Sequence, residues 1–316
     1  MRGWGEQVQT YLLDGQRVCR IVVAEAKGST PREAGADMYV TAHETDGTIG
    51  GGTLEFEAMA LARQILAEIP ENSIGFTRHF RVFALGPNLG QCCGGQVTLL
   101  FEGFTPSCLA VLASACRPSA AGTIHKAERQ FQASDICVPA KDKVCAPVYD
   151  KNSQTLHMPP EKPLVPFYLY GAGHVGRAVM AAVSGLSLEK IWVDTAASRF
   201  PVSADPSVTR VPAADMSVVA AHAPKGAIHI VMSYSHRIDE ALVYTILKKG
   251  DFAHLGLIGS DTKYRRFCTF LKKQGIGDDQ LAQLVCPVGV PVLQSKTPAH
   301  VGLSVATQIA HWLEQA

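Results

Sequence analysis

The first hundred residues place short apolar stretches between glycine- and proline-rich turns. These stretches predict four strands of a sheet, over residues 17–26, 38–40, 76–84 and 96–101. Between the second and third strands, apolar side chains recur every three or four residues: Leu54, Ala58, Leu61, Ile65 and Ile69. They share one face of a helix, which we expect over residues 54–69. The pattern therefore predicts a small mixed α+β domain over residues 1–104.

From residue 164 onward, strand-like apolar runs alternate with helical patterns. The predicted strands cover residues 164–170, 190–194, 227–232 and 255–258, and the predicted helices cover residues 175–183 and 239–248. A last helix begins after Thr297 and Pro298, an N-cap followed by proline at the first helical position. Alternating strands and helices are typical of a parallel sheet covered on both faces. We therefore predict an α/β chain in which residues 164–316 form a Rossmann-like, doubly wound domain.

The stretch between these two domains has weaker signals. Residues 110–116 have helical character, whereas residues 137–147 are rich in Pro, Ala and Lys and show no clear period. We therefore assign residues 105–163 to a connecting region.

The composition excludes several classes of protein. The chain has 316 residues, of which 47% are hydrophobic and 18% charged, and its formal net charge is +1. Such a chain lacks the basic field that drives nucleic-acid binding, so we expect no nucleic-acid partner. It has no apolar run of membrane-spanning length and no export-signal core, so we expect no membrane partner. The nine scattered cysteines are then expected to be reduced thiols in the cytoplasm.

Two adjacent cysteines lie in a glycine-rich turn, residues 85–95 (LGPNLGQCCGG), just before a predicted strand. Glycine has no side chain and lets the backbone approach a ligand closely. Cys92 and Cys93 lack the C-x-x-C spacing of zinc sites, and a disulfide between neighbours is strained. The turn therefore presents a soft sulfur ligand or nucleophile. The alternative is that the two thiols are small residues that fill a tight turn.

Three glycines directly precede the first predicted helix: Gly50, Gly51 and Gly52. Their N–H groups can bind a phosphate or a similar anion, because a helix start favours negative charge. Arg32, in a neighbouring turn, adds positive charge. Glu55 and Glu57 lie in the first helical turn, where we expect only one of them to come close to the glycines. The alternative is that these glycines only shape a turn.

A second glycine motif, residues 171–176 (GAGHVG), follows the first strand of the C-terminal domain and opens its first helix. This is the setting of the dinucleotide fingerprint, which allows a tight turn and a close approach to pyrophosphate. The motif supplies four candidate nucleotide ligands: Gly171, Gly173, His174 and Gly176. Asp194 ends the next strand, where an acidic side chain can hold a ribose hydroxyl. His174 either contacts a ligand or caps the helix.

Residues 233–239 (SYSHRID) follow another predicted buried strand, at the edge where doubly wound sheets bind ligands. His236 and Asp239 are candidates to face the cleft between the domains, although a histidine in a loop is often only solvated. Further along, Lys263, Arg265 and Arg266 begin a basic helix. We expect it to be a solvated face rather than a site for an acidic partner or a phosphate.

Six motifs in one order resemble the XdhC/CoxI family. They are GSTPR at residues 28–32, GTIGGG at 47–52, LGPNLGQCCGG at 85–95, YGAGHVG at 170–176, LIGS at 257–260 and CPVG at 286–289. The series spans nearly the whole chain apart from its middle. It is far more specific than either glycine motif alone.

The resemblance implies a molybdenum cofactor chaperone rather than an enzyme. Family members bind the molybdopterin form of the cofactor and shield it from oxidation. They work with a cysteine desulfurase that adds the terminal sulfur, deliver the cofactor to apo-xanthine dehydrogenase, and are expected to form a homodimer. By matching position, the cofactor-binding residues are Gln91, Cys92, Cys93 and Gly94. Cys93 is our candidate for the molybdenum ligand, and the resemblance leaves open whether Cys92 takes that place.

Two other classes of function compete with a chaperone that holds its cargo between the two domains. The fingerprint with Asp194 favours an NAD(P)-dependent oxidoreductase. If the protein is a chaperone, the same fingerprint remains a potential nucleotide site. A thiol redox sensor would need a lowered thiolate pKa, yet no Lys or Arg stands beside Cys92 and Cys93 in the sequence.

Overall fold

A computed structural model describes residues 4–70, 77–86, 94–110, 112, 122–125, 138–139, 146–159, 163–203, 205, 207–293 and 295–315. By its internal contacts the chain divides into two compact units, Arg2–Pro163 and Leu164–Ala316. We call them the N-terminal unit and the C-terminal unit and describe each by itself. In the described part of the chain, no helix is both long and apolar enough to cross a membrane.

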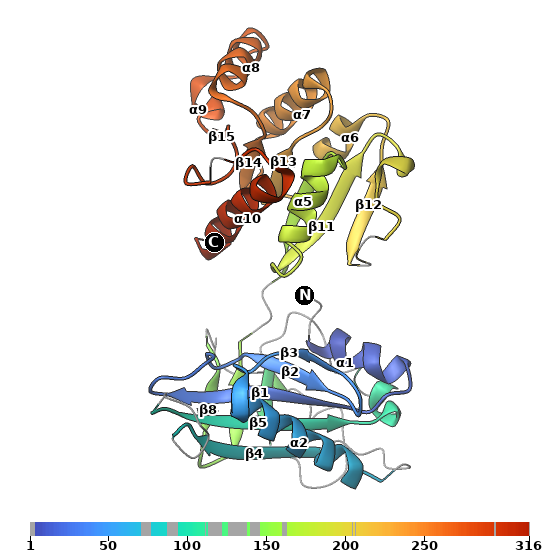
Figure 1. Cartoon of the computed structure of the whole chain (residues 1–316), viewed down its shortest axis with the longest axis vertical. Helices are drawn as coiled ribbons and strands as arrows, with labels where there is room; N and C mark the ends of the chain where they lie inside the picture. Colours follow the sequence, from blue (N-terminus) through green and yellow to red (C-terminus); the bar gives the residue numbers. More distant parts are fainter. Residues whose placement is uncertain are drawn as a thin grey trace. The chain divides into compact units, whose positions relative to one another are not determined.

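The N-terminal unit is built on a five-stranded antiparallel sheet with the order β3-β2-β1-β5-β4. The strands are β1 (Val18–Lys27), β2 (Asp37–Val40), β3 (Thr45–Gly47), β4 (Thr77–Ala84) and β5 (Gln96–Phe104). The helix α2 (Gly52–Glu68) lies across one face of this sheet (Figure 1). Its apolar side packs on Ile21, Leu99 and Phe101, which are fully buried. The predicted α+β arrangement is thus observed.

The opposite face of the same sheet carries a second, smaller sheet. It has the order β7-β6-β9-β8 and consists of β6 (Gly122–His125), β7 (Val138–Pro139), β8 (Val148–Asp150) and β9 (Thr155–Met158). Leu156 of β9 packs against Val22 and Leu100 of the larger sheet. The predicted connecting region therefore belongs to the N-terminal unit, because its strands cover the second face of β1 and β5.

Helix α1 (Trp4–Leu13) and the short helix η2 (Pro106–Cys108) close one end of the N-terminal unit. Val8 and Leu12 of α1 are buried against Val18, Phe104 and Cys108.

The C-terminal unit contains a six-stranded parallel sheet with the order β12-β11-β10-β13-β14-β15. Its strands are β10 (Val165–Tyr170), β11 (Leu188–Asp194), β12 (Val208–Pro212), β13 (Ile228–Val231), β14 (His254–Leu257) and β15 (Leu284–Val285). Numbered within the unit, this order reads 3-2-1-4-5-6, which is that of a Rossmann fold. The structure confirms the predicted doubly wound domain.

Helices cover both faces of this sheet. They are α5 (His174–Ala182), α6 (Met216–Ala221), α7 (His236–Lys249), α8 (Asp261–Lys273), α9 (Asp278–Leu281) and α10 (Pro298–Glu314), with η3 (Ala197–Arg199) after β11. Helices α5 and α10 share one apolar layer with the sheet, and α6, α7 and α8 share the other (Figure 1). The strand order reverses between β10 and β13, and at such a point the carboxyl ends of the strands form a crevice.

Candidate functional site

Three glycine-rich segments of the N-terminal unit meet beside the end of β1, and we call them the N-terminal glycine cluster (residues 28–32, 47–52 and 94–95). Arg32 Nη1 donates to the carbonyl oxygen of Thr48 at 3.2 Å. Gly95 lies so close to Ser29 that an added Cβ would overlap the Ser29 carbonyl oxygen. A residue larger than glycine at position 95 would therefore separate these segments. The structure brings together motifs that are more than sixty residues apart in the sequence.

The loop that carries the two adjacent cysteines begins and ends at this cluster. Leu85 N donates to Gly95 O at 2.8 Å, which joins the two ends of the loop beyond β4 and β5. Gly94 is exposed, and an added Cβ there would meet no atom within 4 Å. Gln91, Cys92 and Cys93 lie outside the described residues.

The anion expected at the start of α2 is the protein's own carboxylate. Glu55 Oε2 accepts hydrogen bonds from Thr48 Oγ1 at 2.6 Å, Gly51 N at 2.9 Å and Ile49 N at 3.1 Å. Burial acts to raise the pKa of Glu55, but these hydrogen bonds outweigh it and hold the pKa below its usual range. Of the two glutamates, only Glu55 faces the glycines, as expected. A ligand anion there would have to displace its carboxylate.

Arg32, predicted to add positive charge for an anion, is engaged as well. Its Nη2 lies 3.1 Å from Glu33 Oε1, and both side chains are substantially exposed. An exposed ion pair of this kind contributes little to stability and opens at small cost. Arg32 therefore links two segments of the cluster while its guanidinium stays accessible to solvent.

The fingerprint turn of the C-terminal unit has the expected geometry. Gly171 has φ +118°, a conformation that favours glycine, and an added Cβ would overlap the Met232 carbonyl. An added Cβ at Gly176 would overlap the Gly171 carbonyl, so α5 packs tightly on the turn. Gly173 is exposed with open space around it, and His174, the first residue of α5, is exposed too. The open side of the turn is thus the side from which a ligand can approach.

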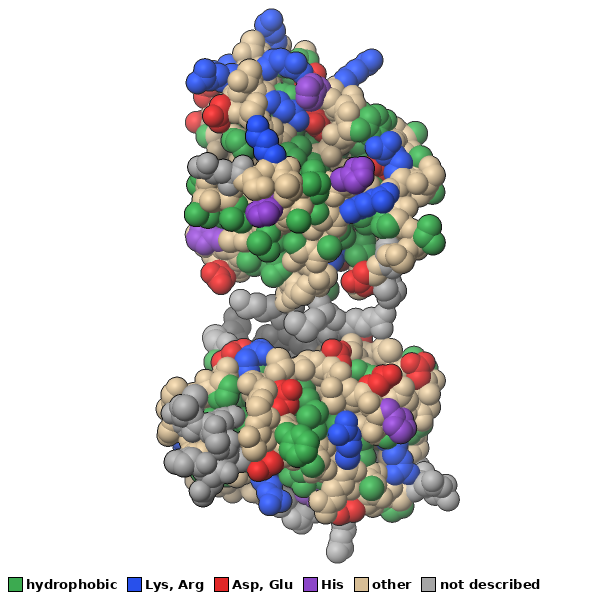
Figure 2. Space-filling view, in the orientation of Figure 1, with side chains coloured by type: hydrophobic (Ala, Val, Ile, Leu, Met, Phe, Trp, Pro, Cys, Tyr) green, Lys and Arg blue, Asp and Glu red, His purple; other side chains and the backbone are tan. Residues whose placement is uncertain are grey.

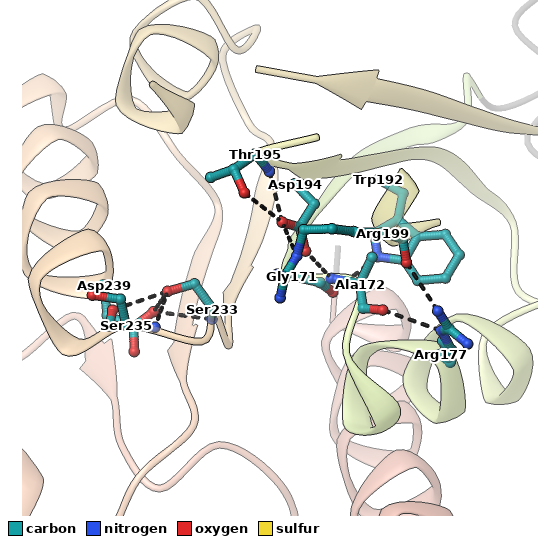
Figure 3. Close-up of polar contacts among 10 residues, drawn as sticks. All are labelled: Gly171, Ala172, Arg177, Trp192, Asp194, Thr195, Arg199, Ser233, Ser235 and Asp239. Carbon is teal, nitrogen blue, oxygen red and sulfur yellow. Dashed lines mark hydrogen bonds and ion pairs between the residues drawn. The ribbon is translucent and has the colours of Figure 1, made fainter. Parts of the chain in front are cut away.

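Asp194, predicted to hold a ribose hydroxyl, is instead bound by its own neighbours (Figure 3). It is fully buried. One oxygen accepts from Ala172 N at 2.6 Å, inside the glycine turn. The other accepts from Thr195 N at 2.6 Å and lies 2.6 Å from Arg199 Nε. The carboxylate therefore fastens the fingerprint turn to the end of β11.

A guanidinium and an exposed ring meet across this edge of the sheet. The Arg199 Cζ atom lies 4.2 Å from the centre of the Tyr234 ring, and the tyrosine is 61% exposed. Arg177 of α5 donates to the carbonyl oxygens of Ala172 and Arg199 (Figure 3). Sequence analysis did not single out Arg199 or Tyr234. Their position along the chain could have identified them, because each follows a strand at the edge of the sheet where doubly wound folds bind ligands.

A second buried carboxylate lies under the loop after β13. Asp239 accepts from Ser233 Oγ at 2.6 Å and forms a 2.8 Å ion pair with Lys263 (Figure 3 shows the serine contact). Asp239 is 1% exposed, so it holds the loop rather than facing a cleft, whereas His236 is exposed. Lys263 is largely buried, and the expectation of a solvated face was wrong for this residue.

The remaining basic residues of α8 are solvated as predicted. Arg265 and Arg266 are exposed, and Arg266 only approaches Glu240, at 3.6 Å. Figure 2 shows Lys and Arg side chains gathered over the end of the C-terminal unit that carries α8. Within the described residues, no group of three or more His, Cys, Asp or Glu side chains is placed to hold a metal ion.

The C-terminal unit, with its strand order and fingerprint turn, defines a Rossmann-type protein with an added α+β domain. Residues 167–309 match the family model of the XdhC Rossmann domain, and residues 12–74 match that of the XdhC and CoxI family. The chain belongs to the XdhC and CoxI family.

Two individual proteins are similar to this chain. The protein YqeB of Escherichia coli (strain K12), described as uncharacterized, is 23% identical over 290 residues. The match covers 91% of this chain but only 42% of YqeB, so the chain spans less than half of that curated relative. A crystal structure described as a xanthine dehydrogenase from Bacillus halodurans has 16% identity and a TM-score of 0.68. It covers 98% of this chain and 96% of that one, and the likeness shows a shared fold.

Proposed function

We propose that this protein is a molybdenum cofactor chaperone, of the kind called xanthine dehydrogenase accessory proteins. It protects the cofactor, supports its sulfuration by a cysteine desulfurase and inserts it into apo-xanthine dehydrogenase. The cofactor is cargo rather than a resident group. Membership of the XdhC and CoxI family supports the proposal.

The observation that carries the proposal is the convergence of the N-terminal glycine cluster on the ends of the cysteine loop. The cluster leaves open space at Gly51 and Gly94, where an added Cβ would meet no atom within 4 Å. A bulky ligand can therefore approach the backbone at these two glycines.

The thiols supply the chemistry that this cargo requires. Molybdenum in the cofactor is bound by dithiolene sulfur, and soft thiolates suit such a centre. In the proposal Cys93 is the ligand and Cys92 supports it, with Gln91 and Gly94 lining the same loop. The homodimer and the cytoplasmic location are further parts of the proposal that rest on the family.

The direct test measures the cargo itself. The full chain is produced in a host that makes molybdenum cofactor and is purified anaerobically under reducing conditions. We expect co-purified molybdenum and the fluorescent oxidised pterin in the wild type, and the loss of most of both in Cys93→Ala. Cys92→Ala measures the supporting role. Cys268→Ala is the matched control, because Cys268 is a free, half-buried cysteine of α8 in the other unit. The absence of pterin from the wild-type protein would contradict the proposal.

The oxidoreductase alternative rests on Asp194, and the contacts of that residue do not favour it. A carboxylate that binds a ribose needs a free acceptor, whereas Asp194 accepts from Ala172 and Thr195 and pairs with Arg199. Reduction of a nicotinamide in the presence of a substrate would restore this alternative.

A further inference from the structure

A pocket of about 380 Å³ opens at the ligand-binding edge of the C-terminal unit. Its polar lining consists of Thr195 directly after β11, Asp215 and Ser217 at the start of α6, and Arg237 in the first turn of α7. Ile238, Ala214 and Ala241 contribute apolar surface, whereas Met216 lies beneath it and is 1% exposed. Its lining comes from the segments that follow β11, β12 and β13, and one of its walls is the residue that follows Asp194.

The polar groups of the pocket retain bonding capacity. Asp215 caps α6 through Oδ1, which accepts from Ser217 N at 3.0 Å and Ser217 Oγ at 2.6 Å. Within the described part of the chain, the second carboxylate oxygen of Asp215 accepts no hydrogen bond. The Arg237 guanidinium forms neither a hydrogen bond nor an ion pair with any described residue. The pocket thus offers a free acceptor for hydroxyl groups and a free cation for an anionic group.

These groups are complementary to a nucleotide. A sugar hydroxyl matches the carboxylate of Asp215, and a phosphate matches the guanidinium of Arg237. A base matches the apolar surface of Ile238 and the two alanines. The volume lies at the low end of the range for small-molecule sites, which favours a single nucleotide over a dinucleotide.

We propose that this pocket binds a nucleoside monophosphate, with Asp215 and Arg237 as its polar ligands. The site differs from the fingerprint prediction, which assigned the ribose to Asp194. Asp194 fastens the glycine turn, and the acidic ligand is provided one strand further along, after β12. The proposal stands apart from the chaperone function, because it rests on residues of the C-terminal unit alone.

The test uses the full chain and measures binding of AMP, GMP, CMP, adenosine and NAD⁺ by isothermal titration calorimetry. Ala241→Trp fills the pocket from an exposed position of α7 and is expected to weaken AMP binding at least about tenfold. Ala299→Trp, an exposed alanine of α10, is the matched control and should bind as the wild type does. Unchanged unfolding midpoints of both variants would show that they are folded.

Arg237→Ala separates the phosphate from the rest of the ligand. We expect it to weaken AMP about threefold to tenfold and to leave adenosine unchanged. The proposal is overturned if no monophosphate binds saturably, if Ala241→Trp binds as tightly as the wild type, or if NAD⁺ binds more tightly than every monophosphate. Cys93→Ala should bind AMP normally, so a failure of the chaperone proposal is distinguishable from a failure of this one.

Discussion

Two carboxylates at turns predicted to bind ligands are bound instead by the protein's own backbone. Glu55 accepts from the loop before α2, and Asp194 accepts from the loop before α5. Sequence analysis located both side chains, but spacing does not reveal which way a side chain points. The role of Asp194 was therefore mistaken, because Ala172 N and Thr195 donate hydrogen bonds to it inside the fold and Arg199, which belongs to no motif, forms an ion pair with it.

Replacing Glu55 by glutamine should loosen the loop before α2. The amide presents only one acceptor oxygen and no charge, so we expect a loss of about 1–3 kcal/mol of unfolding free energy at pH 7. Urea unfolding of Glu55→Gln and of Glu57→Gln, an exposed neighbour, measures the difference.

The effect of Glu55 should also depend on pH. Because folding lowers its pKa, the ionised side chain stabilises the fold above its usual pKa of about 4.5. This contribution is lost as the pH falls through the lower pKa of the folded state. If the unfolding free energies of the wild type and of Glu55→Gln differ by the same amount at pH 7 and at pH 3, this role of Glu55 is contradicted.

A buried histidine makes the C-terminal unit sensitive to acid. Burial lowers the pKa of His229 to about 4, and its Nδ1 lies 3.0 Å from the Tyr170 hydroxyl. The unfolded chain binds a proton near pH 6.5, whereas the folded chain does not. The contribution of His229 to the free energy of unfolding is therefore fully present above pH 6.5, and this free energy falls by about 3 kcal/mol as the pH approaches 4.

The double variant His229→Phe, Tyr170→Phe checks this contribution without leaving a polar group unpaired. Its unfolding free energy should change less between pH 7 and pH 4.5 than that of the wild type. His222→Gln, at an exposed position of the same unit, should retain the wild-type dependence.

At the scale of elements, the periodicity of apolar residues located the strands and helices that pack against a hydrophobic core. Predicted strands at residues 164–170 and 190–194 match β10 and β11, and the predicted helix at residues 54–69 matches α2. Two of the missed elements are short or lie at an edge of a sheet. The edge strand β12 has exposed Thr209 and Arg210, and α6 has only six residues, so neither carries a readable apolar period.

The contact between the fingerprint turn and α5 yields a matched pair of variants. Gly176→Ala places a methyl group against the Gly171 carbonyl and should cost about 2–3 kcal/mol or more. Gly173→Ala adds the same group in open space at an extended φ of −73° and should cost only about 0.5–1 kcal/mol, because alanine is a poorer N-cap than glycine. Thermal unfolding compares them. Equal effects of the two substitutions would mean that α5 does not depend on this close approach.

At the scale of the whole molecule, the apolar cores respect the boundary at residue 164. Every buried cluster in the described part of the chain lies within one unit. The sequence indicated this division through its change of pattern, but it did not reveal that residues 105–163 add a sheet to the first unit. Strands of two to four residues bury too little surface to show a pattern before their partner is known.

Separate cores predict separate folding. A fragment of residues 164–316 should unfold in one cooperative transition and retain the acid sensitivity conferred by His229. Calorimetry of the fragment beside the full chain, at pH 7 and pH 4.5, checks this expectation. An unfolded fragment would mean that the C-terminal unit depends on the rest of the chain.

The hydrogen bond between Leu85 and Gly95 has a consequence for how such proteins diversify. Because the register of β4 and β5 is fixed up to Ala84 and Gln96, the intervening segment can change in length and composition while the sheet stays the same. Under the proposed function, the scaffold and the cargo-binding chemistry are therefore separable modules. We expect an exchange of this segment between family members to transfer the choice of cargo.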